Sequence, residues 1–149
     1  MDIVVTTPKR EMANAAREAE DCKRAGGGEY FRRLPVIHAP LVLPGDRVYY
    51  VEDGAIRGFA VVKRIHATAS GESCDTTGRQ WPPGVYVFMD ATTWHWIRPI
   101  PMKGFQGTRY ARERRQEDGT RCVWNGTGWH RAEILGGWLD TKPVVESAE

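Results

Sequence analysis

The chain has 149 residues, of which 41% are hydrophobic and 27% are charged, the usage of an ordinary globular protein. It contains no apolar stretch of about eighteen residues, so neither a membrane span nor a membrane partner is expected. The three cysteines are widely spaced and form no C-x-x-C pair, which argues against a disulfide framework and a thiolate zinc site and favours a reducing cytoplasm. We expect one domain over 1–140 and a flexible tail over 141–149.

The formal net charge is only +2, but the charge is unevenly distributed. Segment 98–115 contains six Lys and Arg against one Glu, a surplus of 6 − 1 = +5, so the rest of the chain is net acidic. A basic stretch among aromatic residues is typical of proteins that bind nucleic acid or nucleotides.

The N-terminal part of the chain predicts a strand followed by a helix. Residues 3–5 are a short β-branched run, and Thr7-Pro8 is a favourable helix start. Across 9–24 the apolar residues recur at spacings of three and four, until three glycines at 26–28 end the helix. Residues 29–34 are expected to form a further short helical turn.

The clearest element is a β-hairpin. Residues 47–52 and 55–65 are rich in β-branched and aromatic side chains, and Asp53-Gly54 separates them. Asp-Gly supplies the positive φ angles that a two-residue type I′ turn requires. The sequence therefore predicts two antiparallel strands joined at this dipeptide.

The middle of the chain predicts a long loop and two strands. Residues 67–84 are rich in Ser, Thr, Gly, Asp and Pro, which is typical of a surface loop. Strand character returns at 85–89 and again at 92–97. In the second strand, alternation places Trp94 and Trp96 on one face.

The last third predicts an irregular loop and then hairpins. Two prolines and two glycines within 99–107 predict a shaped loop without regular structure. Asp118-Gly119 and Asn125-Gly126 then separate β-prone runs, which predicts one or two late hairpins. The order of a strand, a helix and five or more short strands predicts an α+β, mainly β fold, as a partly closed β-barrel with a helix packed against it.

Two stretches carry a resemblance to a known superfamily. Pro44-Gly45-Asp46-Arg47-Val48-Tyr49-Tyr50-Val51 leads into a strand, and Ile56-Arg57-Gly58-Phe59-Ala60-Val61-Val62 returns from the hairpin. With the N-terminal strand and helix, they make the chain resemble the PUA-like superfamily, particularly its ASCH and EVE branches. The resemblance implies a pseudobarrel with an N-terminal helix, and a cleft used for RNA, for modified bases in DNA or for small nucleosides.

The same resemblance raises the question of catalysis. Some ASCH members are hydrolases of acylated cytidine or of RNA, with a Gly-x-Lys-x-x-Thr-x-Arg pattern near the N-terminus. Residues 7–14 offer Lys9 but lack the preceding glycine and the threonine three places later. A binding module is therefore favoured over an enzyme. The alternative is an amidohydrolase or a ribonuclease, with Lys9, Lys103 and Tyr110 as candidate catalytic groups.

The predicted binding site is an aromatic, basic cleft formed by the segment around 94–110. Aromatic faces stack on bases at about 1–3 kcal/mol each, and Lys and Arg hold phosphates. The predicted lining residues are Trp94, Trp96, Lys103, Gly104, Phe105, Gln106, Arg109 and Tyr110, with Trp81 as a lid. In the structural alternative, Trp94 and Trp96 fill the core and the arginines form a solvated face.

The remaining candidates point to partners rather than to cofactors. The four histidines show no i, i+4 pair and no cysteine at ligand spacing, so no metal and no cofactor is expected. Trp124, Trp129 and Trp138 are assigned to core packing or to an interface. A protein-interaction adaptor that uses exposed tryptophans is thus the third hypothesis, after nucleic-acid binding and hydrolysis.

Overall fold

The computed structural model describes residues 1–6, 29–34, 42–68, 72–73, 80–81, 84–90, 93–105 and 107–137. Their regular structure is built of strands, which confirms the predicted mainly β fold. The strands are β1 (Ile3–Thr6), β2 (Glu29–Leu34), β3 (Arg47–Glu52), β4 (Ala55–Thr68), β5 (Glu72–Ser73), β6 (Gln80–Trp81), β7 (Gly84–Asp90), β8 (His95–Pro101), β9 (Thr108–Tyr110), β10 (Glu113–Arg115), β11 (Arg121–Trp124), β12 (Trp129–Arg131) and β13 (Ile134–Gly137). The helix predicted for 9–24 lies outside the described residues. Within them, no helix is long and apolar enough to cross a bilayer.

The central sheet runs in the order β13-β8-β4-β3-β1-β9, and β1 and β3 are its parallel pair. Strand β4 is long enough for its two halves to pair with different strands. Its first half lies between β3 and β8, and its second half pairs with β7, which in turn pairs with β2. The ladder between β4 and β7 is irregular between Val62 and Arg64, where the extra residue changes the direction of the strand.

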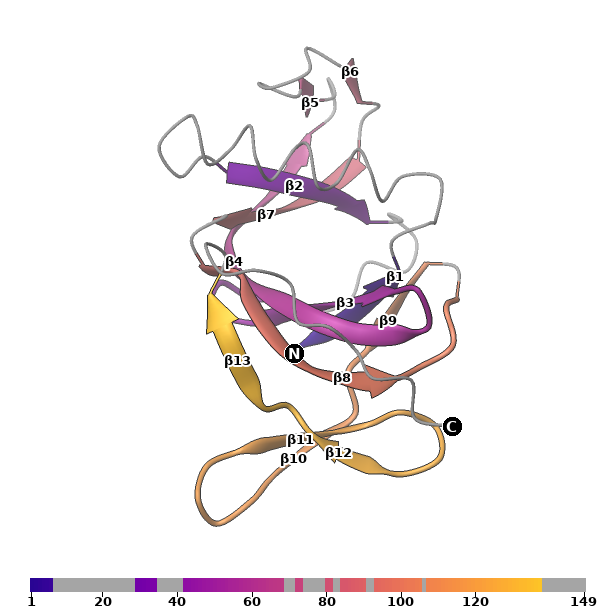
Figure 1. Cartoon of the computed structure of the whole chain (residues 1–149). Helices are drawn as coiled ribbons and strands as arrows, with labels where there is room; N and C mark the ends of the chain where they lie inside the picture. Colours follow the sequence, from indigo (N-terminus) through magenta and orange to yellow (C-terminus); the bar gives the residue numbers. More distant parts are fainter. Residues whose placement is uncertain are drawn as a thin grey trace.

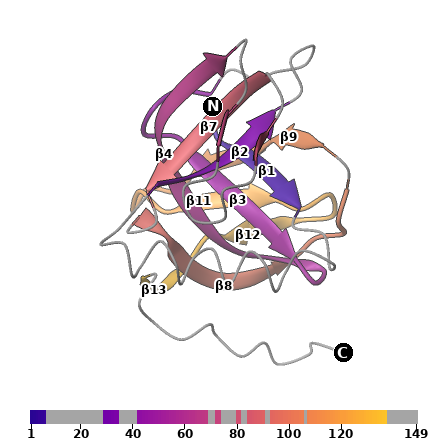
Figure 2. The same ribbon diagram turned by 90° about the horizontal axis from the view of Figure 1, so that it is seen from above.

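Strands β10, β11 and β12 form a separate antiparallel sheet, so the described chain is arranged in three layers. In Figure 1, β2 and β7 lie above the central strands and β10–β12 lie below them. Figure 2 agrees, since β11 and β12 are more distant than β1 and β3 when the molecule is seen from above. Both faces of the central strands are therefore covered.

Each interface between layers has its own hydrophobic core. The β7 core consists of Ile3, Val5, Val42, Val48, Ala60, Val62, Val87 and Met89. The β11 core consists of Val4, Tyr49, Val51, Ile56, Phe59, Ile97, Ile100, Ala111, Val123 and Ala132. Successive side chains of a strand point to opposite faces, so the apolar run of β1 supplies both cores.

The predicted hairpin is confirmed in detail. Asp53 and Gly54 have φ values of 50° and 78°, and β3 pairs with β4 on either side of them. The return strand continues to Thr68, three residues beyond the predicted end. The strand at 84–90 and the two late hairpins are also confirmed, with Gly119 and Gly126 at positive φ in the turns.

Three local predictions are wrong. Residues 29–34 form strand β2 instead of a helical turn, because all six residues pair with β7. The stretch 67–84 contains the end of β4 and the short pair β5 and β6. Residues 99–101 belong to β8 instead of an irregular loop. Pro99 is tolerated there because it stands where the register between β8 and β4 shifts, so the ladder requires no N–H from it.

Candidate functional site

Trp94 and Trp96 form a pair beside the β7 core. Their rings meet edge to face at 5.1 Å, as expected for side chains on one face, and Trp94 also meets Tyr50 at 5.5 Å. Trp94 packs against the β7 core, directly over Gly58. His95 points the other way and stacks on Phe59 of the β11 core at 5.1 Å. This tryptophan pair is half-buried, and at least Trp94 has a packing role.

The basic half of the predicted cleft lies elsewhere. Phe105 packs against the β11 core, its N–H donates to Thr6 Oγ1 at 3.2 Å, and the guanidinium of Arg109 lies 4.2 Å from its ring centre. Lys103 and Gly104 are exposed, and Tyr110 is 47% exposed. Phe105 and Trp94 pack against different cores on opposite faces of the central sheet, so the structure does not bring these two rings together.

The remaining predicted site residues are not placed. Lys9 and Gln106 lie outside the described residues. Trp81 belongs to β6, and the structure describes its backbone only. The roles predicted for these three residues stay predictions, as do those of the placed residues Trp94, Trp96, Lys103, Gly104, Phe105, Arg109 and Tyr110.

A second meeting of tryptophans and cations occurs on β10–β12. Trp124 and Trp129 are direct cross-strand partners, and their rings meet at 5.5 Å. The guanidinium of Arg112 lies 5.2 Å from the Trp124 ring and 5.7 Å from the Trp129 ring, and that of Arg114 lies 4.5 Å from the Trp129 ring. Both arginines are exposed and both indoles are half-buried. We call these four residues the arginine–tryptophan face.

Strand alternation explains how this face forms. On β10, Glu113 pairs with the buried Val123 and faces the central sheet. Its neighbours Arg112 and Arg114 therefore point away from that sheet. Sequence reasoning assigned Trp124 and Trp129 to packing or an interface and missed the face. The available signal was local: arginines at alternate positions, and an Asn-Gly turn between two tryptophans that brings their rings together.

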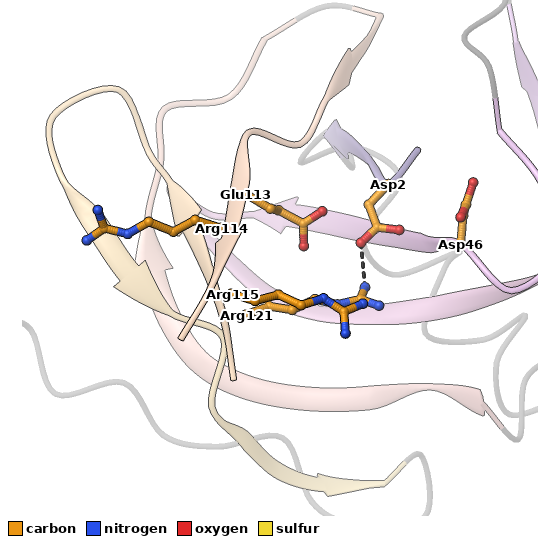
Figure 3. Close-up of a pocket in the computed structure, with 6 residues that line it drawn as sticks. All are labelled: Asp2, Asp46, Glu113, Arg114, Arg115 and Arg121. Carbon is orange, nitrogen blue, oxygen red and sulfur yellow. Dashed lines mark hydrogen bonds and ion pairs between the residues drawn. The ribbon is translucent and has the colours of Figure 1, made fainter. Parts of the chain in front are cut away.

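The other side of β10 borders a hollow of about 350 Å³. It is lined by Asp2, Asp46, Glu113, Arg114, Arg115 and Arg121 (Figure 3). Figure 3 shows Glu113, Arg115 and Arg121 directed toward Asp2, whereas the side chain of Arg114 points away. The hollow thus contains three acidic and three basic residues contributed by the N-terminus, the start of β3 and the β10–β11 hairpin.

Several of these charges are paired. Arg121 Nη1 donates to Asp2 Oδ2 at 2.5 Å, and the backbone N–H of Arg47 donates to Asp2 Oδ1 at 2.8 Å. Asp2 is the more sheltered partner, with its side chain 9% exposed. The N-terminal amine lies 2.6 Å from Asp46 Oδ2. These contacts hold the N-terminus against the start of β3 and, through Arg121, against the β10–β11 hairpin.

Glu113 is the titratable group of most interest in the hollow. Tyr49 Oη donates to Glu113 Oε2 at 3.0 Å, and Arg47 Nη1 donates to Tyr49 Oη at 3.3 Å. Burial, with a hydrogen bond to Asp2 and its negative charge as further causes, raises the pKa of Glu113 to about 7. At neutral pH this carboxyl is therefore divided between a protonated form that can donate a hydrogen bond and an ionised form that cannot.

No family model, curated protein or solved structure matches the chain. The function must therefore be argued from the geometry alone. Among the described residues no three His, Cys, Asp or Glu side chains gather as a metal-binding group. Within the same ranges, the arginine–tryptophan face combines exposed cations with two indoles, and the hollow gathers six charged side chains.

Proposed function

We propose that the protein is a nucleic-acid-binding module that holds a single strand on the arginine–tryptophan face. The observation that carries the proposal is the pair of adjoining indoles on β11 and β12 with two exposed arginines over them.

The chemistry of the face fits an unpaired base. An indole face stacks on any base, and a guanidinium plane can both stack on a base and bind a phosphate. Single strands expose their base faces, whereas a duplex hides them, so the face favours single-stranded RNA or DNA. The exposed Arg109 and Lys103 are further candidates for contacts to phosphates along the strand.

The PUA-like pseudobarrel is part of the same proposal. Two features of the described sheets support it: the strand β4, shared between two pairings, and the two covered faces of the central strands. The helix at 9–24 would pack against this barrel. A cytoplasmic location agrees with the free, buried thiol of Cys122.

Fluorescence anisotropy with a short labelled single strand tests the proposal. Trp129→Ala should weaken binding by about 5- to 150-fold, which corresponds to the loss of one base stack. Trp96→Ala is the matched control, because it removes a half-buried indole from the other pair, and its affinity per folded molecule should equal that of the wild type. Far-UV circular dichroism checks the fold of both variants.

Salt and charge variants provide an independent measurement. Affinity should fall steeply with salt, and Arg112→Gln and Lys103→Ala should weaken binding to many sequences alike. Equal affinities for wild type, Trp129→Ala and Arg112→Gln, or binding that ignores salt, would contradict the proposal.

Hydrolysis of a modified nucleoside or of RNA is the second candidate function, and the position of Glu113 favours it. A carboxyl with a pKa of about 7 beside two arginines has the properties of a general acid or base. Incubation with RNA and with acylated cytidine tests this candidate. Turnover should be lost in Glu113→Gln, and the absence of turnover by the wild type would eliminate hydrolysis of these substrates.

A further inference from the structure

Two arginines face each other inside the hollow. Arg115 and Arg121 are direct cross-strand partners on β10 and β11, and Figure 3 shows their side chains running to the same side, beneath Asp2. Like charges placed directly opposite in an antiparallel pair destabilise a sheet. A pair of this kind in a concave site is suited to an anionic ligand, because the ligand would relieve the repulsion.

Among the described residues, the acidic groups of the hollow compensate Arg121 and leave Arg115 without an acidic partner. Asp2 is bound by Arg121, and Asp46 by the N-terminal amine. The carboxyl of Glu113 accepts a hydrogen bond from the buried Tyr49. Within the described ranges, the side chain of Arg115 has no hydrogen bond, ion pair or ring contact. Its guanidinium is therefore an uncompensated cation on the wall of the hollow.

The hollow is joined to the arginine–tryptophan face through Arg114. This residue lines the hollow, and its guanidinium lies over Trp129 on the other side of β10. Strand β10 is the edge of its sheet, so a ligand can pass around it without crossing a ladder. A nucleotide whose base stacks at Trp129 thus has the hollow, with Arg115 on its wall, next to it.

We propose that this hollow binds the terminal phosphate of the strand held on the arginine–tryptophan face. The inference rests on the proposed function and specifies that the protein recognises a strand end. A terminal phosphomonoester carries about −1.5 to −2 charges at pH 7 and presents three acceptor oxygens, against one charge for a phosphate within the chain. Two guanidinium groups can bind it through paired N–H donors. The volume of about 350 Å³ admits a phosphate with part of its sugar.

The ionisation of Glu113 makes this binding depend on pH. The groups that face Glu113 are Asp2 before β1, Asp46, Arg47 and Tyr49 at β3, Arg115 on β10 and Arg121 on β11. An ionised Glu113 repels a phosphate, whereas a protonated one can donate a hydrogen bond to it. Affinity for the terminal phosphate should therefore rise as the pH falls from about 8 toward 6.5.

The test compares one short single strand with a 5′-phosphate, with a 3′-phosphate and with hydroxyls at both ends. One phosphorylated form should bind at least about tenfold more tightly than the hydroxyl form, which corresponds to one or two charge-assisted hydrogen bonds. Arg115→Gln should abolish this advantage and leave the affinity for the hydroxyl form unchanged. Glu113→Gln should keep the advantage and remove its rise toward low pH, leaving only the change that the titration of the phosphate itself produces. Arg98→Gln, which removes an exposed arginine paired with Glu133, is the control and should alter neither.

The possible outcomes separate the two proposals. If all three strands bind with equal affinity and Arg115→Gln changes none of them, the terminal-phosphate inference is overturned and the proposed function stands. If none of the strands binds, both are overturned. If Arg98→Gln loses the tighter binding of the phosphorylated strand as Arg115→Gln does, this binding depends on the overall positive charge of the protein. That result would also contradict the inference. Circular dichroism of each variant confirms that a lost advantage does not arise from unfolding.

Discussion

The two tryptophan pairs of this protein have similar ring geometry and different surroundings. Trp94 and Trp96 meet edge to face at 5.1 Å, and Trp124 and Trp129 do so at 5.5 Å. The first pair lies over a glycine and a tyrosine beside the β7 core, whereas the second lies beneath two exposed arginines. A pair of indoles is therefore not a site by itself, because its neighbours decide whether it serves packing or binding.

The largest expected loss of stability concerns Gly58, which lies beneath Trp94 of the first tryptophan pair. A Cβ at position 58 would lie 2.3 Å from Cζ2 of Trp94 and 2.6 Å from the carbonyl oxygen of His95. The ring would have to leave its place, and the backbone oxygen cannot move without disturbing β8. Gly58→Ala should therefore cost about 3 kcal/mol of unfolding free energy, measured by urea denaturation.

Gly104→Ala is the matched control for that substitution. Its Cβ would lie 3.1 Å from Cγ2 of Thr6, which is a side-chain atom that can shift. The cost should stay below about 1 kcal/mol. Equal stability losses at the two glycines would show that Trp94 is not packed tightly against β4.

A smaller change in stability is expected from the titration of Glu113. This residue links β10, beside the arginine–tryptophan face, to the central sheet through Tyr49. Its folded-state pKa of about 7 lies above the ordinary value of 4.5, so the folded protein binds the proton more tightly than the unfolded chain. The stabilisation is fully present below pH 4.5 and is lost as the pH rises through 7. We expect stability to fall by roughly 1–2 kcal/mol between pH 5 and 8.

Chemical denaturation across this pH range measures the effect, and Glu113→Gln should flatten the profile. Glutamine can still accept a hydrogen bond from Tyr49 but does not titrate in this range. If the unfolding free energy of Glu113→Gln still falls between pH 5 and 8, the group that titrates in this range is not Glu113.

The sequence predicted the local structure better than the site. The hairpin at Asp53-Gly54 was predictable because its turn depends only on two neighbouring residues. Strand β2 was not, because its state depends on pairing with β7, about fifty residues away along the chain. The separation of Trp94 from Phe105 was unpredictable for a related reason. Trp94 and Phe105 are near in sequence, but nothing in the sequence reports that the central sheet separates them.

The smallest expected change in stability distinguishes the two tryptophan regions most clearly. The substitution Arg115→Gln should raise the unfolding free energy, whereas a packing defect lowers it. Arg115 stands opposite Arg121 and has no compensating partner in the described structure. Removing its charge in Arg115→Gln should relieve like-charge repulsion and raise the unfolding free energy by about 0.2–1 kcal/mol at low salt. High salt should erase the gain, because it screens the repulsion in the wild type.

Arg98→Gln should instead leave stability unchanged or slightly reduced, since an exposed ion pair with Glu133 contributes little. A residue that lowers stability while it remains available to an anion is expected at a binding site and not in a packing role. A clear loss of stability in Arg115→Gln would mean that this guanidinium supports the fold. The hollow would then have a structural role, as the pair of Trp94 and Trp96 does.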